Sequence, residues 1–227
     1  MTETILVIAA HPDDEVLGVG ATVARHAAAG DAVHTIIVAE GATSRDAQRN
    51  NAARVDELIA LRQSAAEAAA ILGTSQPILL GLPDNRLDSC DLLDIVKKIE
   101  AVVDRVKPSV IYTHHAGDLN VDHQIVHEAV LVACRPLPAS PIRAIYAFET
   151  VSATEWSPQQ TFLPNHFVDA GPTWQKKMAA LSIYESEMRP FPHARSLEAV
   201  EALAKWRGSS VGLNKAEAFQ IIRQLQC

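Results

Sequence analysis

A histidine and three acidic residues stand together in the hexapeptide AHPDDE, at positions 10–15. A catalytic zinc site needs about three protein ligands with nitrogen or oxygen donors and leaves one position for water. His11, Asp14 and the distant His123 have the right chemistry to supply these three ligands. Asp13 is then free to act as general base toward water at the metal, because a metal lowers the pKa of that water. The residue types therefore predict a metal site with hydrolytic chemistry.

Two of these assignments have structural alternatives that the sequence leaves open. Asp14 and Glu15 are also suited to stabilise the start of a helix, because carboxylates interact favourably with the positive end of its dipole. His11 fits equally well as a hydrogen-bonded histidine in a turn.

A second histidine pattern involves His123 and His127, which have the i, i+4 spacing of a zinc-protease helix. Gln124 stands where that motif has a glutamate. We therefore expect His127 to support or pack against the site rather than to bind metal.

Candidates for binding a substrate or cofactor are sparse. Arg45 lies in a polar loop and is suited to bind a carboxylate, a phosphate or a sugar hydroxyl, with a solvated side chain as the equal alternative. Gly18 and Gly20 resemble half of a dinucleotide fingerprint, but they follow the acidic turn. A phosphate there would face carboxylates, so we reject a dinucleotide site.

The elements that must position these residues alternate between strand and helix. Residues 5–9 form a continuous apolar run, which is typical of a parallel strand buried on both faces. A helix over 16–29 and a strand over 33–39 complete a βαβ unit. The hexapeptide then lies at the carboxyl end of the first strand, where open α/β sheets bind ligands.

The alternation continues to about residue 150. The patterns predict strands over 77–80, 109–113 and 143–148, and helices over 52–72, over 92–107 after a cap at Asp91 or Ser89, and over 124–134. Polar segments over 40–51 and 114–123 follow strands and are expected at the same sheet edge. The predicted fold is α/β, a Rossmann-like three-layer α/β/α arrangement with a mostly parallel sheet.

Beyond residue 150, prolines separate shorter elements, with helices expected over 173–186, 197–207 and 216–225. We interpret this part as a helical and loop appendage. The prediction is one domain over 1–227, with a core over 1–150 and an extension over 151–227 packed on it.

The composition excludes several classes of partner. The 227 residues are 48% hydrophobic and carry a formal net charge of −7, without clusters of Lys and Arg. Nucleic acids and anionic membranes require such clusters, so a small-molecule substrate is expected. The three cysteines lack CxxC spacing and indicate a reducing compartment. Without a signal-peptide pattern or a long apolar stretch, we predict a cytoplasmic protein with no membrane insertion.

The motifs together resemble those of the PIG-L/LmbE-like zinc-dependent N-deacetylases, a family that includes N-acetylglucosaminyl deacetylases. The resemblance rests on the hexapeptide and on Asp122-His123, and it is strengthened by Leu82-Pro83-Asp84-Asn85 and by Gly208 with residues 216–219. It therefore covers nearly the whole chain. It implies one Zn²⁺ ion, replaceable by Fe²⁺ or Co²⁺, and hydrolysis of an N-acetyl amide on an amino sugar with release of acetate.

The resemblance also implies roles for individual residues. The implied zinc ligands are His11, Asp14 and His123. Asp13 is the implied base, and Asp122 is a carboxylate behind the ligands that tunes their protonation. The expected substrate contacts come from variable loops and are Arg45, Asp84 and Asn85. Because some members use a histidine of a neighbouring chain, a homo-oligomer is expected.

One position departs from the family pattern. Many members carry a histidine three residues before the last ligand, where it stabilises the oxyanion, and this chain has Asn120 there. An asparagine donates a hydrogen bond to an oxyanion but cannot act as a general acid. The hypothesis is that His193, in the proline-rich segment 190–196, supplies the proton in its own or an adjacent subunit. An ordinary loop histidine is the alternative.

Two other functions fit the same residues. The metal site is also suited to an amide in a natural-product intermediate, such as an acylated aminoglycoside or glycopeptide. A non-catalytic domain that stores metal or binds a small molecule is less favoured, because Asp13 would then have no consequence.

Overall fold

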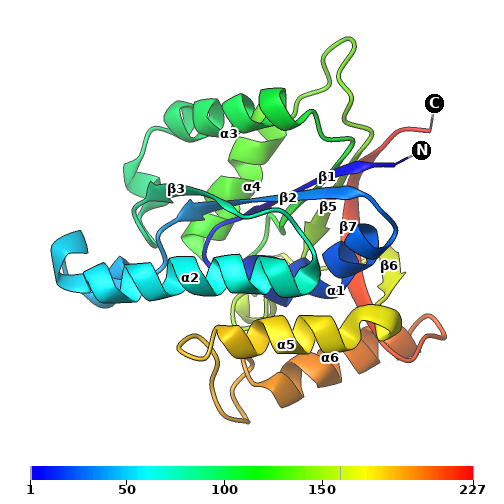
Figure 1. Cartoon of the computed structure of the whole chain (residues 1–227). Helices are drawn as coiled ribbons and strands as arrows, with labels where there is room; N and C mark the ends of the chain where they lie inside the picture. Colours follow the sequence, from blue (N-terminus) through cyan, green and yellow to red (C-terminus); the bar gives the residue numbers. More distant parts are fainter. Residues whose placement is uncertain (1, 159, 227) are drawn as a thin grey trace.

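The computed structural model describes residues 2–158 and 160–226, and one seven-stranded sheet forms the centre of this part of the chain (Figure 1). The strand order is β3-β2-β1-β4-β5-β7-β6. The strands are β1 (Thr4–Ala9), β2 (Ala32–Ala39), β3 (Ile78–Leu82), β4 (Val110–His114), β5 (Ala144–Phe148), β6 (His166–Asp169) and β7 (Ala216–Gln224). The first five pair in parallel, whereas β7 is antiparallel to both β5 and β6.

Strand β1 lies where the strand order reverses. The chain runs from β1 to β2 and β3 on one side, and β4 and β5 lie on the other. Residues 5–9 are fully buried, as their continuous apolar character predicts. Ligands of open α/β sheets bind outside the carboxyl ends of strands at such a switch point. The end of β1 is therefore where the fold favours a site.

Helices cover both faces of the sheet (Figure 1). On one face lie α3 (Leu92–Val106) and α4 (Val121–Ala133), and on the other lie α1 (Asp14–Ala28) and α2 (Val55–Leu72). Helix α5 (Trp174–Ile183) packs on α1 and α2, and α6 (Leu197–Ser209) packs on β7. Short 3₁₀ turns are η1 (Thr43–Arg45), η2 (Asn51–Arg54), η3 (Leu87–Ser89), η4 (Thr154–Trp156) and η5 (Gly171–Thr173). The predicted three-layer α/β/α arrangement is confirmed.

The prediction of a helix over 216–225 is wrong, because Ala216–Gln224 is strand β7. Phe219 and Ile221 face the core on the α1 side, and Ile222 faces the core on the α3 side. This alternation has the period of a strand. Pairing with β5 and β6 overrides the local helix preference of the Ala-Glu-Ala segment, as tertiary context commonly does.

The interpretation of the C-terminal part as a helical and loop appendage needs correction for the same reason. Strands β6 and β7 continue the sheet of the core. Other predicted boundaries differ slightly: the helix expected over 173–186 ends at Ile183, and the helix expected over 124–134 begins at Val121.

A buried ion pair joins the C-terminal part to α1. Lys177 Nζ lies 2.6 Å from Glu217 Oε1 and donates to the carbonyl of Leu17 at 2.7 Å. The same carboxylate accepts hydrogen bonds from the backbone nitrogens of Ala21 and Thr22 at 2.9 and 2.7 Å. Glu217 thus connects β7 both to α5 and to the middle of α1.

Among the described residues, no helix is both long enough and apolar enough to cross a bilayer.

Candidate metal and catalytic site

The hexapeptide forms the turn between β1 and α1, and His123 lies in the first turn of α4. Because β1 and β4 are parallel neighbours, the segments that follow their carboxyl ends meet at one sheet edge. His11 is 8% exposed, whereas Asp14 and His123 are fully buried. The predicted ligands are therefore brought together from positions over a hundred residues apart.

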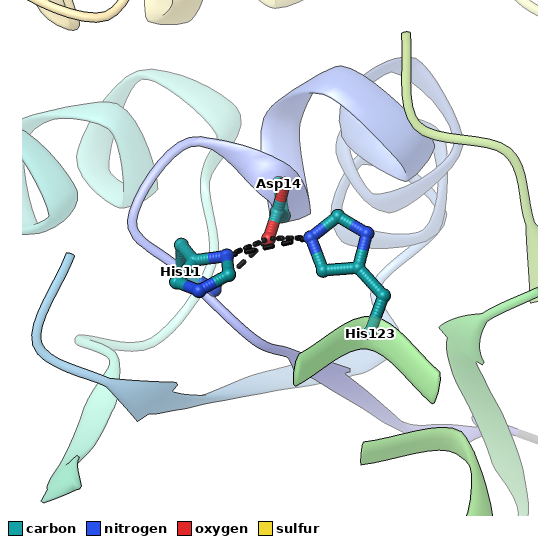
Figure 2. Close-up of side chains that lie close together, drawn as sticks. All are labelled: His11, Asp14 and His123. Carbon is teal, nitrogen blue, oxygen red and sulfur yellow. Dashed lines mark hydrogen bonds and ion pairs between the residues drawn. The ribbon is translucent and has the colours of Figure 1, made fainter. Parts of the chain in front are cut away.

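Figure 2 shows these three side chains converging on one point. Asp14 Oδ2 lies 3.2 Å from His11 Nδ1 and 3.1 Å from His123 Nε2, and the two nitrogens are 3.3 Å apart. Ligands held about 2.0–2.1 Å from a tetrahedral zinc ion lie about 3.3 Å from one another. The other oxygen, Asp14 Oδ1, is buried without a hydrogen-bond partner among the described residues. The donor set and its spacing fit a zinc-like ion.

Two overlapping groups in the described part of the chain also bring metal-binding atoms together, His114 with Asp118 and His123, and His11 with Asp84 and Asp122. His114 Nε2 already accepts a hydrogen bond from the Ala10 nitrogen at 2.9 Å. The second group is similarly occupied, because the oxygens of Asp122 accept from the backbone nitrogens of Asn85 and Leu87 at 2.7 and 2.9 Å. The donor set and spacing therefore leave His11, Asp14 and His123 as the candidate ligand set that the sequence predicts.

Each of the two candidate ligand histidines has a carboxylate next to its other ring nitrogen. His11 Nε2 lies 3.0 Å from Asp122 Oδ2, and His123 Nδ1 lies 3.2 Å from Asp118 Oδ1. Such carboxylates fix the ring orientation and tautomer of metal-binding histidines and raise their basicity. Asp122 was predicted in this position. Asp118 was not predicted, although it lies in the same polar loop only five residues before His123.

The charges of this cluster shift its pKa values strongly. Burial lowers the pKa of His123, but the charges and hydrogen bonds of Asp14 and Asp118 outweigh it and raise the pKa to about 9. Burial raises the pKa of Asp14, yet the neighbouring His123 and His11 hold it well below its ordinary value. Burial lowers the pKa of His114 well below its usual range, which agrees with a neutral ring that accepts from Ala10.

Asp13 sits beside the ligands in a strained conformation, with φ of 114° and a 1% exposed surface. Strain of this kind is concentrated at functional sites. Its nitrogen donates to Glu15 Oε2 at 3.0 Å, and Tyr184 donates to Glu15 Oε1 at 2.6 Å. Burial raises the pKa of Glu15 to about 7 and that of Asp13 well above its ordinary value. Glu15 lies in the first turn of α1, where the sequence suggested a helix-start role, and it also holds the backbone of Asp13.

The remaining predicted residues lie around this centre with varied contacts. Asp84 is 1% exposed and lies 3.3 Å from His11 Nε2, with Oδ2 accepting from the Ser44 nitrogen. Asn120 caps α4, because its Oδ1 accepts from the Asp122 nitrogen at 2.9 Å and its Nδ2 donates to Asn85 at 2.8 Å. Asp84 therefore contacts His11 directly, whereas Asn120 contacts Asp122 and Asn85 beside it.

Arg45 and His193 lie further out. Arg45 contacts Glu57 at 3.1 Å and Glu187 at 2.7 Å, so its guanidinium joins the loop after β2 to the segment after α5. His193 is exposed, and its Nδ1 accepts from the Arg195 nitrogen at 3.0 Å. His193 also meets Trp156 edge to face, with ring centroids 6.2 Å apart.

The residue of segment 190–196 that contacts Asp13 is Arg195, whose Nη1 lies 2.5 Å from Asp13 Oδ2. Sequence reasoning missed this arginine, because no spacing relates it to a residue 182 positions earlier.

The fold and the site define an α/β protein with a cluster of metal-binding residue types at the switch point of its sheet. The profile of the PIG-L family, described as GlcNAc-PI de-N-acetylase, matches residues 6–134, which is more than half of the chain. The chain belongs to this family.

Two similar proteins are named deacetylases, whereas one similar solved structure is named a hydratase. The uncharacterized deacetylase YaiS of Escherichia coli is 31% identical over 188 residues, covering 80% of this chain and 90% of that protein. A probable N-acetyl-alpha-D-glucosaminyl L-malate deacetylase 2 of Bacillus cereus is 26% identical, covering 91% and 94%. The solved 4-carboxy-2-hydroxymuconate hydratase of Pseudomonas putida superposes with a TM-score of 0.77 at 25% identity, covering 100% and 98%.

Proposed function

We propose that this chain is a metal-dependent N-deacetylase that hydrolyses the N-acetyl amide of an amino-sugar conjugate and releases acetate. The observation that carries the proposal is the triangle of His11, Asp14 and His123, with Asp13 next to it. Membership of the PIG-L family and the similarity to named deacetylases support the same chemistry. When bound, a zinc ion supplies a Lewis acid that acidifies water and polarises a carbonyl oxygen.

The residues of the chain have separate tasks in this proposal. His11, Asp14 and His123 hold the metal, and Asp122 and Asp118 orient the two histidines. Asp13 accepts the proton of the attacking water, which adds oxygen to the acetyl carbon. Cleavage of the C–N bond then leaves the electron pair on nitrogen, and the amine departs after it receives a proton.

The residues proposed to contact the substrate and to donate the proton are those that the sequence predicts. We propose that Arg45 and Asn85, on the loops after β2 and β3, contact the sugar or the group attached to it. Asp84 and Asn120 stay as candidates, with Asn120 as a donor to the oxyanion. His193 is proposed as the group that protonates the leaving amine.

We further propose Zn²⁺ as the metal, since two histidines, one carboxylate and an open position are typical of catalytic zinc, with Fe²⁺ or Co²⁺ able to replace it. A cytoplasmic location is supported by Cys90 and Cys134, which are free thiols. A homo-oligomer is proposed from the family resemblance and is tested by light scattering after gel filtration.

The deciding experiment measures acetate release by the purified protein from a panel of N-acetylglucosamine conjugates, with metal analysis of the same preparation. Release that depends on bound metal supports the proposal. The panel includes an N-acylated glycopeptide and an unsaturated carboxylate, because one relative with a full-length structural match is a hydratase. Hydration of the carboxylate without acetate release from any amide would overturn the proposal.

A further inference from the structure

Arg195 contacts the carboxylate to which the proposed reaction assigns the proton transfer. Its Nη1 lies 2.5 Å from Asp13 Oδ2, where the Asp13 side chain is 1% exposed and the Arg195 side chain 20%. We propose that Arg195 is a positioning residue that holds Oδ2 of Asp13, so that Oδ1 is the oxygen left free to accept the proton. This inference rests on the proposed deacetylase function and deepens it.

The other parts of Asp13 are already held by its own turn. Its nitrogen donates to Glu15, and its carbonyl oxygen accepts from the nitrogens of Val16 and Leu17 at 3.0 and 2.8 Å. The backbone therefore fixes Cα, but rotation about the side-chain bonds is left to whatever holds the carboxylate. Oδ1 is buried without a hydrogen-bond partner in the described part of the chain. The contact with Arg195 thus sets which oxygen is engaged.

Arg195 is itself held from several sides. Its Nε donates to Ser152 Oγ at 2.7 Å, and its nitrogen donates to His193 Nδ1 at 3.0 Å. Its carbonyl oxygen accepts from the Arg189 nitrogen at 3.2 Å. The next residue, Ser196, caps α6 by accepting from the Ala199 nitrogen at 3.0 Å. A side chain supported in this way is able to fix the geometry of a catalytic group, because positioning requires a rigid partner.

The competing explanation is a purely structural ion pair. Removing one partner of a buried pair destabilises a protein whether or not a reaction takes place. A positioning role makes a further demand: Arg195 must matter to turnover only through the carboxylate of Asp13. The two explanations therefore differ in kcat, in KM and in the additivity of substitutions.

The test compares kcat and KM for acetate release by Arg195→Ala, Arg195→Lys and the wild type. We expect Arg195→Ala to lower kcat about 100-fold with KM nearly unchanged, because small displacements of a catalytic group cost this much. Added methylguanidinium is expected to restore part of the rate, and Arg195→Lys to retain part of it. Zinc content is expected to stay at the wild-type level. Arg189→Ala, in the same loop with its guanidinium on backbone carbonyls, is the matched control.

A double variant and a crystal structure of an Arg195 variant complete the test. In an Asp13→Asn background, Arg195→Ala is expected to cause no further loss of kcat. A further loss of the same size, or wild-type kcat in Arg195→Ala, would overturn the proposal. If the wild type releases no acetate, the proposed function fails. A crystal structure of Arg195→Ala, or of Arg195→Lys if that variant alone folds, then still reports on positioning, and an unmoved Asp13 carboxylate contradicts it.

Discussion

At the scale of single residues, the site divides its acidic groups by what they touch. Asp14 faces both ligand histidines, Asp122 and Asp118 face their outer nitrogens, and Asp13 faces Arg195. In the proposed mechanism, the same residue type therefore serves as ligand, as orienting group and as base. The contacts of each carboxylate, rather than its identity, determine its role.

Substituting Asp13 tests whether this residue acts as the general base without binding the metal. Asp13→Asn is expected to lower kcat by about 10²–10⁴-fold, the usual contribution of a general base. Asparagine has nearly the same shape as aspartate, and the backbone of the turn is held by hydrogen bonds of the Asp13 nitrogen and carbonyl oxygen, so the turn should be kept. Metal analysis of the purified variant is expected to show the wild-type zinc content. Full activity in Asp13→Asn would contradict the assignment of the base.

Substituting His193 tests the proposed proton donor. His193→Ala is expected to reduce turnover of N-acetyl substrates about 10²-fold or more, as for other general acids, with intact zinc content. Steady-state kinetics on substrates with amines of different basicity measures it, since a missing acid harms the poorest leaving groups most. Near-wild-type turnover would show that the exposed His193 is an ordinary loop residue.

At the scale of secondary-structure elements, α1 is tied to the site through β5. Phe148, at the end of β5, packs over Gly18 of α1, where an added Cβ would lie 2.2 Å from Cδ2 of the ring. The ring of His114 lies 4.7 Å from Phe148 and stacks on His123 at 3.8 Å, centroid to centroid. The close approach of α1 to β5 is therefore linked through Phe148 and His114 to the position of His123 on α4.

Gly18→Ala is expected to destabilise the protein by about 1–3 kcal/mol, the usual cost of overpacking a core. Gly20→Ala is the matched control on the same helix, because its Cβ would meet Val16 Cγ1 at 3.0 Å and the Lys177 side chain at 3.3 Å. There the gain in helix propensity, about 1 kcal/mol, offsets the tighter contact. Urea unfolding of both variants measures the difference, and equal midpoints would contradict the packing described.

At the scale of the whole molecule, residues after about 150 add strands to the sheet of the N-terminal part and contact its site. Strands β6 and β7 extend the sheet, the Lys177–Glu217 pair contacts α1, and Arg195 reaches Asp13. A metal held at the proposed site would therefore lie among contacts that come from both parts of the chain. A ligand that binds only the folded state stabilises it as its concentration exceeds Kd.

Removing the metal with a chelator is expected to lower Tm by about 5–10 °C relative to protein with zinc at about 100 times Kd. Differential scanning calorimetry measures the shift. Asp14→Asn is expected to abolish it because a ligand is lost, whereas Asp13→Asn keeps it. A zinc-dependent shift that survives Asp14→Asn would place the metal elsewhere.

The sequence by itself determined the class of fold and pointed to the residues that the structure brings together as candidate ligands. An apolar strand followed by AHPDDE, together with a polar segment after another strand, is enough to predict one metal site, because parallel strands place their carboxyl ends at a common edge. Tertiary structure alone decided that Asp118 backs His123, that Arg195 meets Asp13, and that 216–224 is a strand. Those outcomes depend on contacts between distant segments, which local periodicity and spacing do not encode.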